Sequence, residues 1–366
     1  MAPHSFDGNT PLIMRRFIPV LLLALFTASL APRLAADLVW QPGTGWRVEG
    51  GVLGLLSTED GRNALDIMNK ARNAEEAGQM SSALNSYRRV VKRYGSSVYA
   101  SEALFRIGNI LQKRRQYYKA FDSYQSLLTL YPNSDKFNQV VAEQYRIASL
   151  LQEGKRPYYW GIIPGFRNRE RALQYMEQIV ANAPYSDYAP LSLMNAARGY
   201  QKIGETEVAI DALDRMINNY AKSVLTPDAY LKIAETHASL VEGPYYDQAS
   251  TKEAITYYED YLILFPGDSG AAAAEKGLAK MKTVLAQSKM ILADYNFKYR
   301  KNYQAAKIFY NEAITTYPDS EVAATARAKL VKVEALLAAQ PKPGAASSGT
   351  APAPAPVQKK KRFWLF

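Results

Sequence analysis

Residues that commonly carry chemistry are scarce in this chain of 366 residues, which has no cysteine and two histidines, His4 and His237. Without cysteine it can form no disulfide, no thiolate metal site and no thiol nucleophile. His4 lies in a segment that we expect to be removed, so a histidine-based site has one candidate left. No glycine-rich phosphate loop or nucleophile elbow is present either. We therefore expect no catalytic residue, no metal site and no cofactor.

Carboxylates are the remaining candidates for acid–base chemistry. A pair that acts on glycans needs two carboxyl groups held about 5–10 Å apart in a cleft. Here the acidic residues fall on helix positions that should face solvent, among lysines and arginines. Nothing in their spacing selects a pair, so the sequence favours a binding protein over an enzyme.

The last eight residues combine four successive cations with an aromatic end, which suggests contact with a membrane. Cations are attracted to anionic lipid by about 1 kcal/mol each, and aromatic rings favour the membrane interface. Alternatively, this tail docks into a groove of a partner or has no role. The candidate residues are Lys359, Lys360, Lys361, Arg362, Phe363, Trp364 and Phe366.

The start of the chain reads as a targeting segment. Arg15 and Arg16 precede an apolar run at 17–31 and then small residues up to Ala36, which is the pattern of a secretory signal peptide. We assign residues 1–36 to it, with Met14 as an alternative true start. A retained inner-membrane anchor is the other interpretation, although a span needs about 20 apolar residues. An exported protein rarely meets nucleic acid. Four of the positive charges lie together in the tail, so the body is only mildly basic, whereas a nucleic-acid site needs a concentrated basic face; we therefore expect no nucleic-acid partner.

The elements that position these residues are revealed by a repeat. A small residue lies twelve positions before each of four turn prolines, and a bulky residue lies eight before it. The small residues are Ala120, Ala172, Ala254 and Ala306, the bulky ones are Tyr124, Met176, Tyr258 and Tyr310, and two units without the proline contain Ala83 with Tyr87 and Ala209 with Leu213. Upstream apolar residues recur at i, i+3, i+4 and i+7, as on one face of a helix. His237 takes a usually aromatic position of this pattern, so we expect it to pack.

The pattern matches the 34-residue tetratricopeptide repeat. It predicts an all-α tetratricopeptide-repeat superhelical solenoid of about five to six helical hairpins, with a capping helix over 320–339. Neighbouring hairpins must stack, because one helix pair cannot bury its apolar face alone. First helices should line a concave groove, and second helices should form the outer wall.

Several segments fall outside the repeats, which should occupy residues 62–339. Residues 37–61 read as an irregular lead-in, 340–358 as an Ala/Pro-rich linker, and 359–366 as the basic-aromatic tail. A further insertion at 154–168 contains Tyr158, Tyr159, Trp160 and Phe166. It either packs onto the solenoid or contacts a partner, and Trp160 is a candidate for contact with a membrane or a partner.

The predicted groove mixes flexible apolar side chains with hydrogen-bonding ones. Such a surface suits an extended peptide, whose backbone amides need partners and whose side chains need shallow pockets. A merely solvated face is the alternative. The residues expected to line it are Met68, Arg72, Phe105, Asn109, Gln112, Lys113, Met194, Arg198, Gln201 and Lys202.

Two stretches resemble one known family. MILADYNFKYRKNYQAAKIFYNEAITTYPDSEVAATA, which begins at Met290, resembles the last repeat of BamD-type outer-membrane assembly lipoproteins, and GPYYDQASTKEAITYYEDYLILFPGDS at 243–269 resembles the preceding one. The resemblance covers about residues 62–339. The chain departs from the family in lacking the cysteine that carries the lipid, so we hypothesise that the C-terminal tail replaces that anchor.

The resemblance implies a periplasmic scaffold, peripherally associated with the outer membrane, in the machinery that assembles β-barrels. Its partners would be a BamA-like insertase and unfolded outer-membrane proteins, which such scaffolds bind partly through the C-terminal strand of the substrate. One alternative is a Tol–Pal-type envelope coordinator, although 37–61 shows no heptads. Another is a repeat-bearing peptidoglycan enzyme, for which no stretch outside the repeats is long enough to form a catalytic domain.

Overall fold

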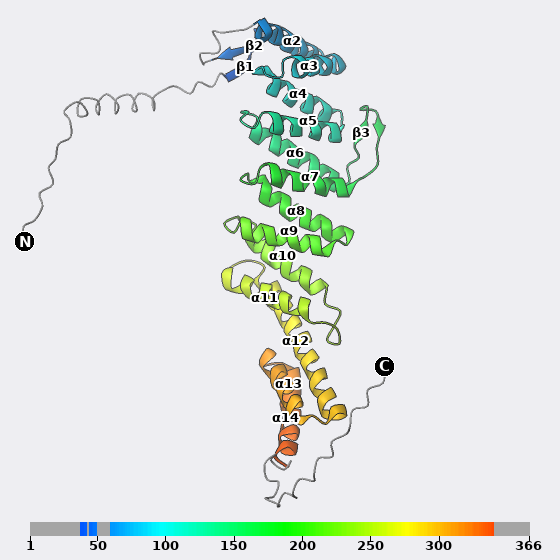
Figure 1. The fold of residues 1–366 in the computed structure, drawn as a ribbon, viewed down its shortest axis with the longest axis vertical. Helices are drawn as coiled ribbons and strands as arrows, with labels where there is room; N and C mark the ends of the chain where they lie inside the picture. Colours follow the sequence, from blue (N-terminus) through cyan, green and yellow to red (C-terminus); the bar gives the residue numbers. More distant parts are fainter. Residues whose placement is uncertain (1–36, 42–43, 50–58, 340–366) are drawn as a thin grey trace, which may run out of the picture. The chain divides into compact units, whose positions relative to one another are not determined.

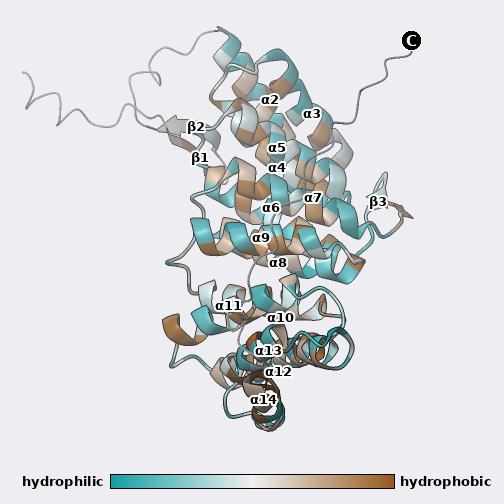
Figure 2. Cartoon of the chain, turned by 60° about the horizontal axis from the view of Figure 1, so that its bottom comes forward, coloured by the Kyte–Doolittle hydropathy of each residue, from teal (hydrophilic) through white to brown (hydrophobic). Residues whose placement is uncertain are grey.

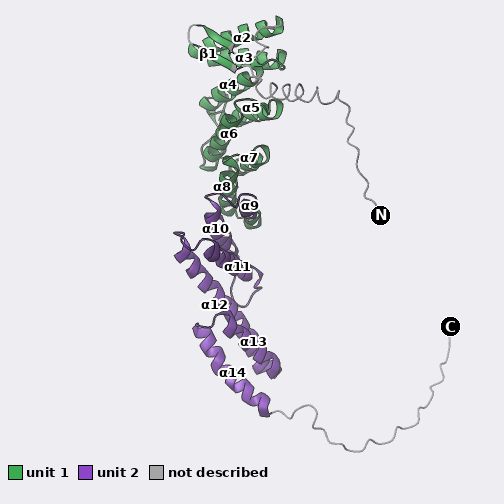
Figure 3. Cartoon of the chain, turned by 90° about the vertical axis from the view of Figure 1, so that its left-hand side faces the viewer, with its two compact units in different colours: residues 1–212 green, residues 213–366 purple. Residues whose placement is uncertain are grey.

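The computed structural model describes residues 37–41, 44–49 and 59–339. The chain divides into two compact units, residues 1–212 and 213–366 (Figure 3). The helices of the first unit are α2 (Glu59–Glu76), α3 (Met80–Arg93), α4 (Tyr99–Lys113), α5 (Tyr117–Leu130), α6 (Phe137–Gln152), α7 (Arg169–Asn182) and α8 (Tyr188–Ile203), and α9 (Thr206–Asn219) crosses the boundary. The second unit contains α10 (Thr226–Ser239), α11 (Ala249–Leu264), α12 (Ala271–Tyr295), the π-helix η2 (Asn296–Arg300), α13 (Tyr303–Thr316) and α14 (Glu321–Ala339).

Successive helices pack on one another within each unit. In the first unit α2 packs on α3, α3 on α4, α4 on α5, and so on to α8; in the second unit the same order runs from α10 to α14 (Figure 1). Hydrophobic and hydrophilic residues share each helix (Figure 2), as expected when each helix buries one face. The predicted fold class, an all-α tetratricopeptide-repeat solenoid, is confirmed. Taken in order, the described helices form six pairs followed by α14.

The same turn follows the second helix of each pair. In each case a backbone N–H donates to the carbonyl three residues earlier and so closes the chain reversal. The bonds run from Ser97 to Tyr94, Ser134 to Tyr131, Ser186 to Ala183, Ser223 to Tyr220, Asp268 to Phe265 and Ser320 to Tyr317, at 2.8–3.2 Å. The turn forms with or without proline, which explains why the two units that lack it still fit the repeat.

The structure corrects the prediction that the segment after residue 36 is irregular. β1 (Asp37–Gln41) and β2 (Gly45–Glu49) form an antiparallel hairpin that pairs Trp40 with Trp46. Gly45, at φ +84°, supplies the left-handed residue next to the turn. The Trp46 N–H donates to the Asn69 side chain at 2.8 Å, and Arg106 lies over the Trp46 ring at 5.4 Å. The glycines of this segment suggested irregular structure. The hairpin is stabilised by contacts with α2 and α4, which the local sequence does not reveal.

The last helices of the second unit meet at Asp294 on α12. Its carboxylate accepts hydrogen bonds from Tyr310 on α13 and, at 2.7 Å, from Lys329 on α14. Burial alone would raise the pKa of Asp294, but these bonds and the charge of Lys329 outweigh it and lower the pKa. Asp294 therefore stays ionised and links α14 to the two helices before it.

Among the described residues, no helix has both the length and the apolar character needed to cross a membrane. The apolar run at 17–31, the Ala/Pro-rich linker at 340–358 and the basic-aromatic tail at 359–366 all lie outside the described residues.

Candidate functional site: a polar strip on the first helices

The first helices of unit one carry a line of polar side chains, which we call the first-helix strip. It runs from α2 through α4 and α6 to α8. Its members are Arg72, Glu75, Arg106, Asn109, Gln112, Lys113, Glu143, Arg146, Asn195 and Arg198.

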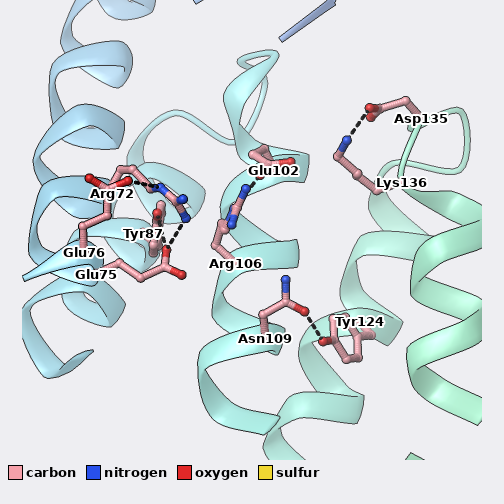
Figure 4. Close-up of polar contacts among 10 residues, drawn as sticks. All are labelled: Arg72, Glu75, Glu76, Tyr87, Glu102, Arg106, Asn109, Tyr124, Asp135 and Lys136. Atoms are coloured by element: carbon pink, nitrogen blue, oxygen red, sulfur yellow. Dashed lines mark hydrogen bonds and ion pairs between the residues drawn. The ribbon is translucent and has the colours of Figure 1, made fainter. Parts of the chain in front are cut away.

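On α2, the strip is organised around Glu75. Arg72 lies 3.4 Å from the Glu75 carboxylate and 3.1 Å from that of Glu76, and the Tyr87 hydroxyl of α3 donates to Glu75 at 2.9 Å (Figure 4). Burial and the neighbouring carboxylate raise the pKa of Tyr87 well above its usual range, so the hydroxyl remains a donor. The tyrosine of the second helix thereby fixes an acidic group of the first.

On α4, a buried ion pair underlies the strip. The Arg106 guanidinium donates to the Glu102 carboxylate at 2.7 Å (Figure 4), and Glu102 is buried. Burial raises the pKa of Glu102, and Arg106 opposes this increase. Because Arg106 also lies over Trp46, this pair connects α4 to the N-terminal hairpin.

The next turn of α4 links α5 and α6. The Tyr124 hydroxyl lies 2.7 Å from Asn109 Oδ1 and 2.8 Å from Gln112 Oε1, and Gln112 Nε2 donates to Glu143 at 2.6 Å. Burial raises the pKa of Tyr124 well above its usual range. A chain of hydrogen bonds therefore crosses three helices and holds the strip in register.

The strip continues from α6 to α8. Asn195 Nδ2 donates to the Tyr145 hydroxyl at 2.6 Å, and Gln152 Nε2 donates to the Asn195 carbonyl at 2.6 Å. Arg146 lies 3.4 Å from Glu143 and is exposed, as is Arg198 on α8. Exposed cations and amides on a rigid support can bind carboxylates and backbone groups of an extended chain.

The structure corrects part of the predicted groove. Met68 and Met194 are only 0% and 4% exposed, so they belong to the core and cannot face a ligand. Gln112 is also buried, and its hydrogen-bonding groups are used within the strip. Each first helix packs against its own second helix and against neighbouring repeats, which leaves only a narrow stripe open. The rest of the predicted set is half-buried (Arg72, Phe105, Asn109, Gln201) or exposed (Lys113, Arg198, Lys202).

Sequence reasoning missed five members of the strip: Glu75, Arg106, Glu143, Arg146 and Asn195. Glu75, Arg106 and Asn195 each lie three positions from a predicted groove residue on the same helix, whereas Glu143 and Arg146 lie on α6, where no groove residue was predicted. The α6 residues were missed because the insertion at 154–168 obscured the first helix of that unit. Helical periodicity applied to 137–152 could have found them.

A second surface feature of unit one lies on the opposite side of α4, between α3 and α5. This second-helix groove has a volume of about 350 Å³. Its floor is apolar and its rim carries cations. The lining residues are Arg88, Val91, Lys92, Leu104, Ile107, Leu111, Lys119, Asp122, Ser123 and Ser126.

Unit two has a pocket of about 450 Å³ between the loop after α10, α12 and the start of α14. Tyr245 and Met290 line it, and Tyr245 is largely exposed. His237 lies elsewhere in this unit and stacks on Tyr257, with ring centroids 5.5 Å apart. Within the described residues, no cluster of three or more histidine, aspartate or glutamate side chains could hold a metal ion.

Comparison with known families shows what the chain resembles. Residues 167–345 match the family model described as outer membrane lipoprotein (YfiO), and residues 102–134 match a tetratricopeptide-repeat model. This chain is a BamD-like tetratricopeptide-repeat protein. No curated protein matches it.

Solved structures overlap the BamD-like chain only loosely. A tetratricopeptide repeat protein from Parabacteroides merdae is 14% identical, with 75% of this chain and 99% of that chain covered and a TM-score of 0.31. MamA from Desulfovibrio magneticus is 14% identical, with 58% and 98% covered and a TM-score of 0.29. PilF from Pseudomonas aeruginosa is 12% identical, with 74% and 100% covered and a TM-score of 0.27. The identification therefore rests on the family models.

Proposed function

We propose that this BamD-like protein is a periplasmic scaffold of the machinery that assembles β-barrels into the outer membrane. The observation that carries the proposal is the match of residues 167–345 to the outer membrane lipoprotein family. The protein would work by binding, without catalysis. Its partners would be a BamA-like insertase and unfolded barrel proteins.

The first-helix strip is our candidate for the substrate surface. An unfolded barrel segment is an extended chain with unpaired backbone amides, and at its end it has a carboxylate. The strip offers exposed cations (Lys113, Arg146, Arg198) beside amides that are already oriented by Tyr124 and Tyr145. Because the amides are held by these tyrosines before binding, they lose little conformational entropy when the ligand arrives.

A charge-reversal experiment tests the strip. The double variant Arg146→Glu, Arg198→Glu should bind a fluorescent peptide with the sequence of a barrel C-terminal strand about tenfold more weakly, since each lost charge-assisted contact is worth about 1 kcal/mol or more. Fluorescence anisotropy measures the affinity. Both arginines are exposed, so the fold should be unaffected, and circular dichroism checks this.

The matched control reverses two exposed cations of the second-helix groove, Arg88→Glu and Lys119→Glu. This variant has the same change in net charge and should bind the peptide like the unaltered protein. If the control loses binding while the strip variant keeps it, the substrate surface is the second-helix groove and the assignment of the strip is wrong.

A further inference from the structure

The insertion between α6 and α7 presents large apolar side chains to solvent. β3 (Tyr158–Tyr159) and β4 (Ile163–Pro164) form a short antiparallel hairpin that stands out from the side of the helices (Figure 1). Trp160 is 67% exposed, Ile162 77% and Phe166 87%. Large side chains gathered this way on one projecting element indicate an interaction site.

The tip of this hairpin has an unfavourable backbone. Trp160 has φ +53° and Gly161 has φ +81°, and the Ile162 N–H donates to the Tyr159 carbonyl at 3.1 Å to close the turn. Glycine adopts this left-handed conformation freely, whereas a bulky residue rarely does. A tryptophan at this position therefore works against local stability, which points to a role for its side chain outside the fold.

The hairpin is held in place by the preceding α4–α5 turn. The Tyr158 N–H donates to the Arg115 carbonyl at 2.8 Å, and the Arg114 guanidinium donates to the Trp160 carbonyl at 3.2 Å. The Arg115 guanidinium also lies over the Tyr158 ring at 5.4 Å. The base of the hairpin is thus packed on the solenoid, as one of the two interpretations of the insertion predicted, and the tip projects into solvent.

Positive charge surrounds the base. Residues 154–169 contain four cations and no carboxylate, and Arg114 and Arg115 add two more at the contact. The cations of the segment are Lys155, Arg156, Arg167 and Arg169, all exposed. The nearest acids along the chain, Glu153 and Glu170, lie just outside it.

We propose that this hairpin docks onto an anionic phospholipid surface. Trp160, Ile162 and Phe166 would enter the interfacial layer, where aromatic and aliphatic side chains are favoured, and the cations at the base would meet the phosphate groups. A lipid surface accepts a projecting apolar tip at any depth, whereas a protein partner would need a pocket of matching shape. The excess of cations over acids in and beside the hairpin also favours an anionic surface. The contact would add to any anchor supplied by the ends of the chain.

A fluorophore at the tip tests this in the full chain. Because the chain has no cysteine, Ile162→Cys gives a single attachment site for a nitrobenzoxadiazole probe. Vesicles of phosphatidylcholine with phosphatidylglycerol should shift the emission to the blue and increase it several-fold. Vesicles of phosphatidylcholine alone should have little effect, and added salt should weaken the response.

Three variants sharpen the result. In the labelled chain, Arg156→Glu with Arg167→Glu should weaken the vesicle response about tenfold, whereas the matched control Arg62→Glu with Lys70→Glu on α2 should leave it unchanged. Trp160→Gly should also weaken the response, with a melting temperature equal to or above that of the parent, because glycine relieves the turn.

The probe reports only on the surroundings of position 162, so membrane binding through another segment would not change its emission. A probe at Asn85→Cys, an exposed position of α3, should stay in water when vesicles are added. If the chain sediments with anionic vesicles but the emission at position 162 does not change, the hairpin does not contact lipid and the proposal is wrong. A shift at position 162 produced only by a protein partner would likewise overturn it in favour of a protein contact.

Discussion

Replacing Gly108 by alanine is expected to lower the free energy of unfolding by about 2–3 kcal/mol, at the upper end of the usual cost of overpacking a core. A Cβ at this position would lie 2.2 Å from Tyr124 Cε1. Tyr124 cannot move aside, because it is fully buried and its hydroxyl is bonded to Asn109 and Gln112. Chemical denaturation followed by circular dichroism measures the loss.

The control for this prediction is Gly267→Ala. Gly267 is an exposed turn residue, and a Cβ there would meet nothing within 4 Å, so the change should be close to neutral. The cost of Gly108→Ala should also shrink in a Tyr124→Ala background, since the two residues are in contact. Equal costs with and without the tyrosine ring would show that the close approach of α4 and α5 is not the cause.

Replacing Arg106 by methionine should cost about 3 kcal/mol near neutral pH, because it leaves a buried carboxylate without its partner. Glu102 already has a raised pKa through burial, and Arg106 is the main group that lowers it. In the variant the pKa of Glu102 in the folded state rises further above that in the unfolded state. Protonation of Glu102 then favours the folded state. The loss of stability caused by Arg106→Met should therefore be largest above the pKa of Glu102 in the folded state, and it should shrink as the pH falls through that pKa.

Unfolding curves of Arg106→Met recorded between neutral and mildly acidic pH measure this dependence. The double variant Glu102→Gln, Arg106→Met removes the buried charge and should recover much of the stability at neutral pH. Arg146→Met, which removes an exposed arginine from an i, i+3 ion pair with Glu143, should cost less than about 1 kcal/mol. A deficit in Arg106→Met that does not change with pH would show that lost packing against Trp46, and not the buried charge, is responsible.

The repeat pattern predicted the core correctly because it encodes close packing. The six small residues twelve positions before each turn, from Ala83 to Ala306, are all fully buried. The bulky residues eight before it, including Tyr124 and Tyr310, are buried as well. A helix pair tolerates only these sizes where its axes approach, so spacing along the chain was enough to place them.

The candidate surfaces could be predicted only in part, because exposure depends on which neighbours a helix meets. Met68 and Met194 lie on first helices as expected, yet neighbouring elements cover them. The tyrosine hydroxyls that orient Glu75 and Asn109 join residues 12 and 15 positions apart on different helices. The hairpin tip at Trp160 depends on contacts with Arg114 and Arg115, more than forty residues earlier, which no local pattern records.

The central claim is that this BamD-like protein serves β-barrel assembly through protein partners. Crosslinking in the native host followed by affinity purification of the full chain tests it most directly. The account predicts recovery of a BamA-like insertase and of unfolded barrel proteins, the latter reduced by Arg146→Glu with Arg198→Glu. Recovery of Tol–Pal components without the insertase or any barrel protein would contradict it.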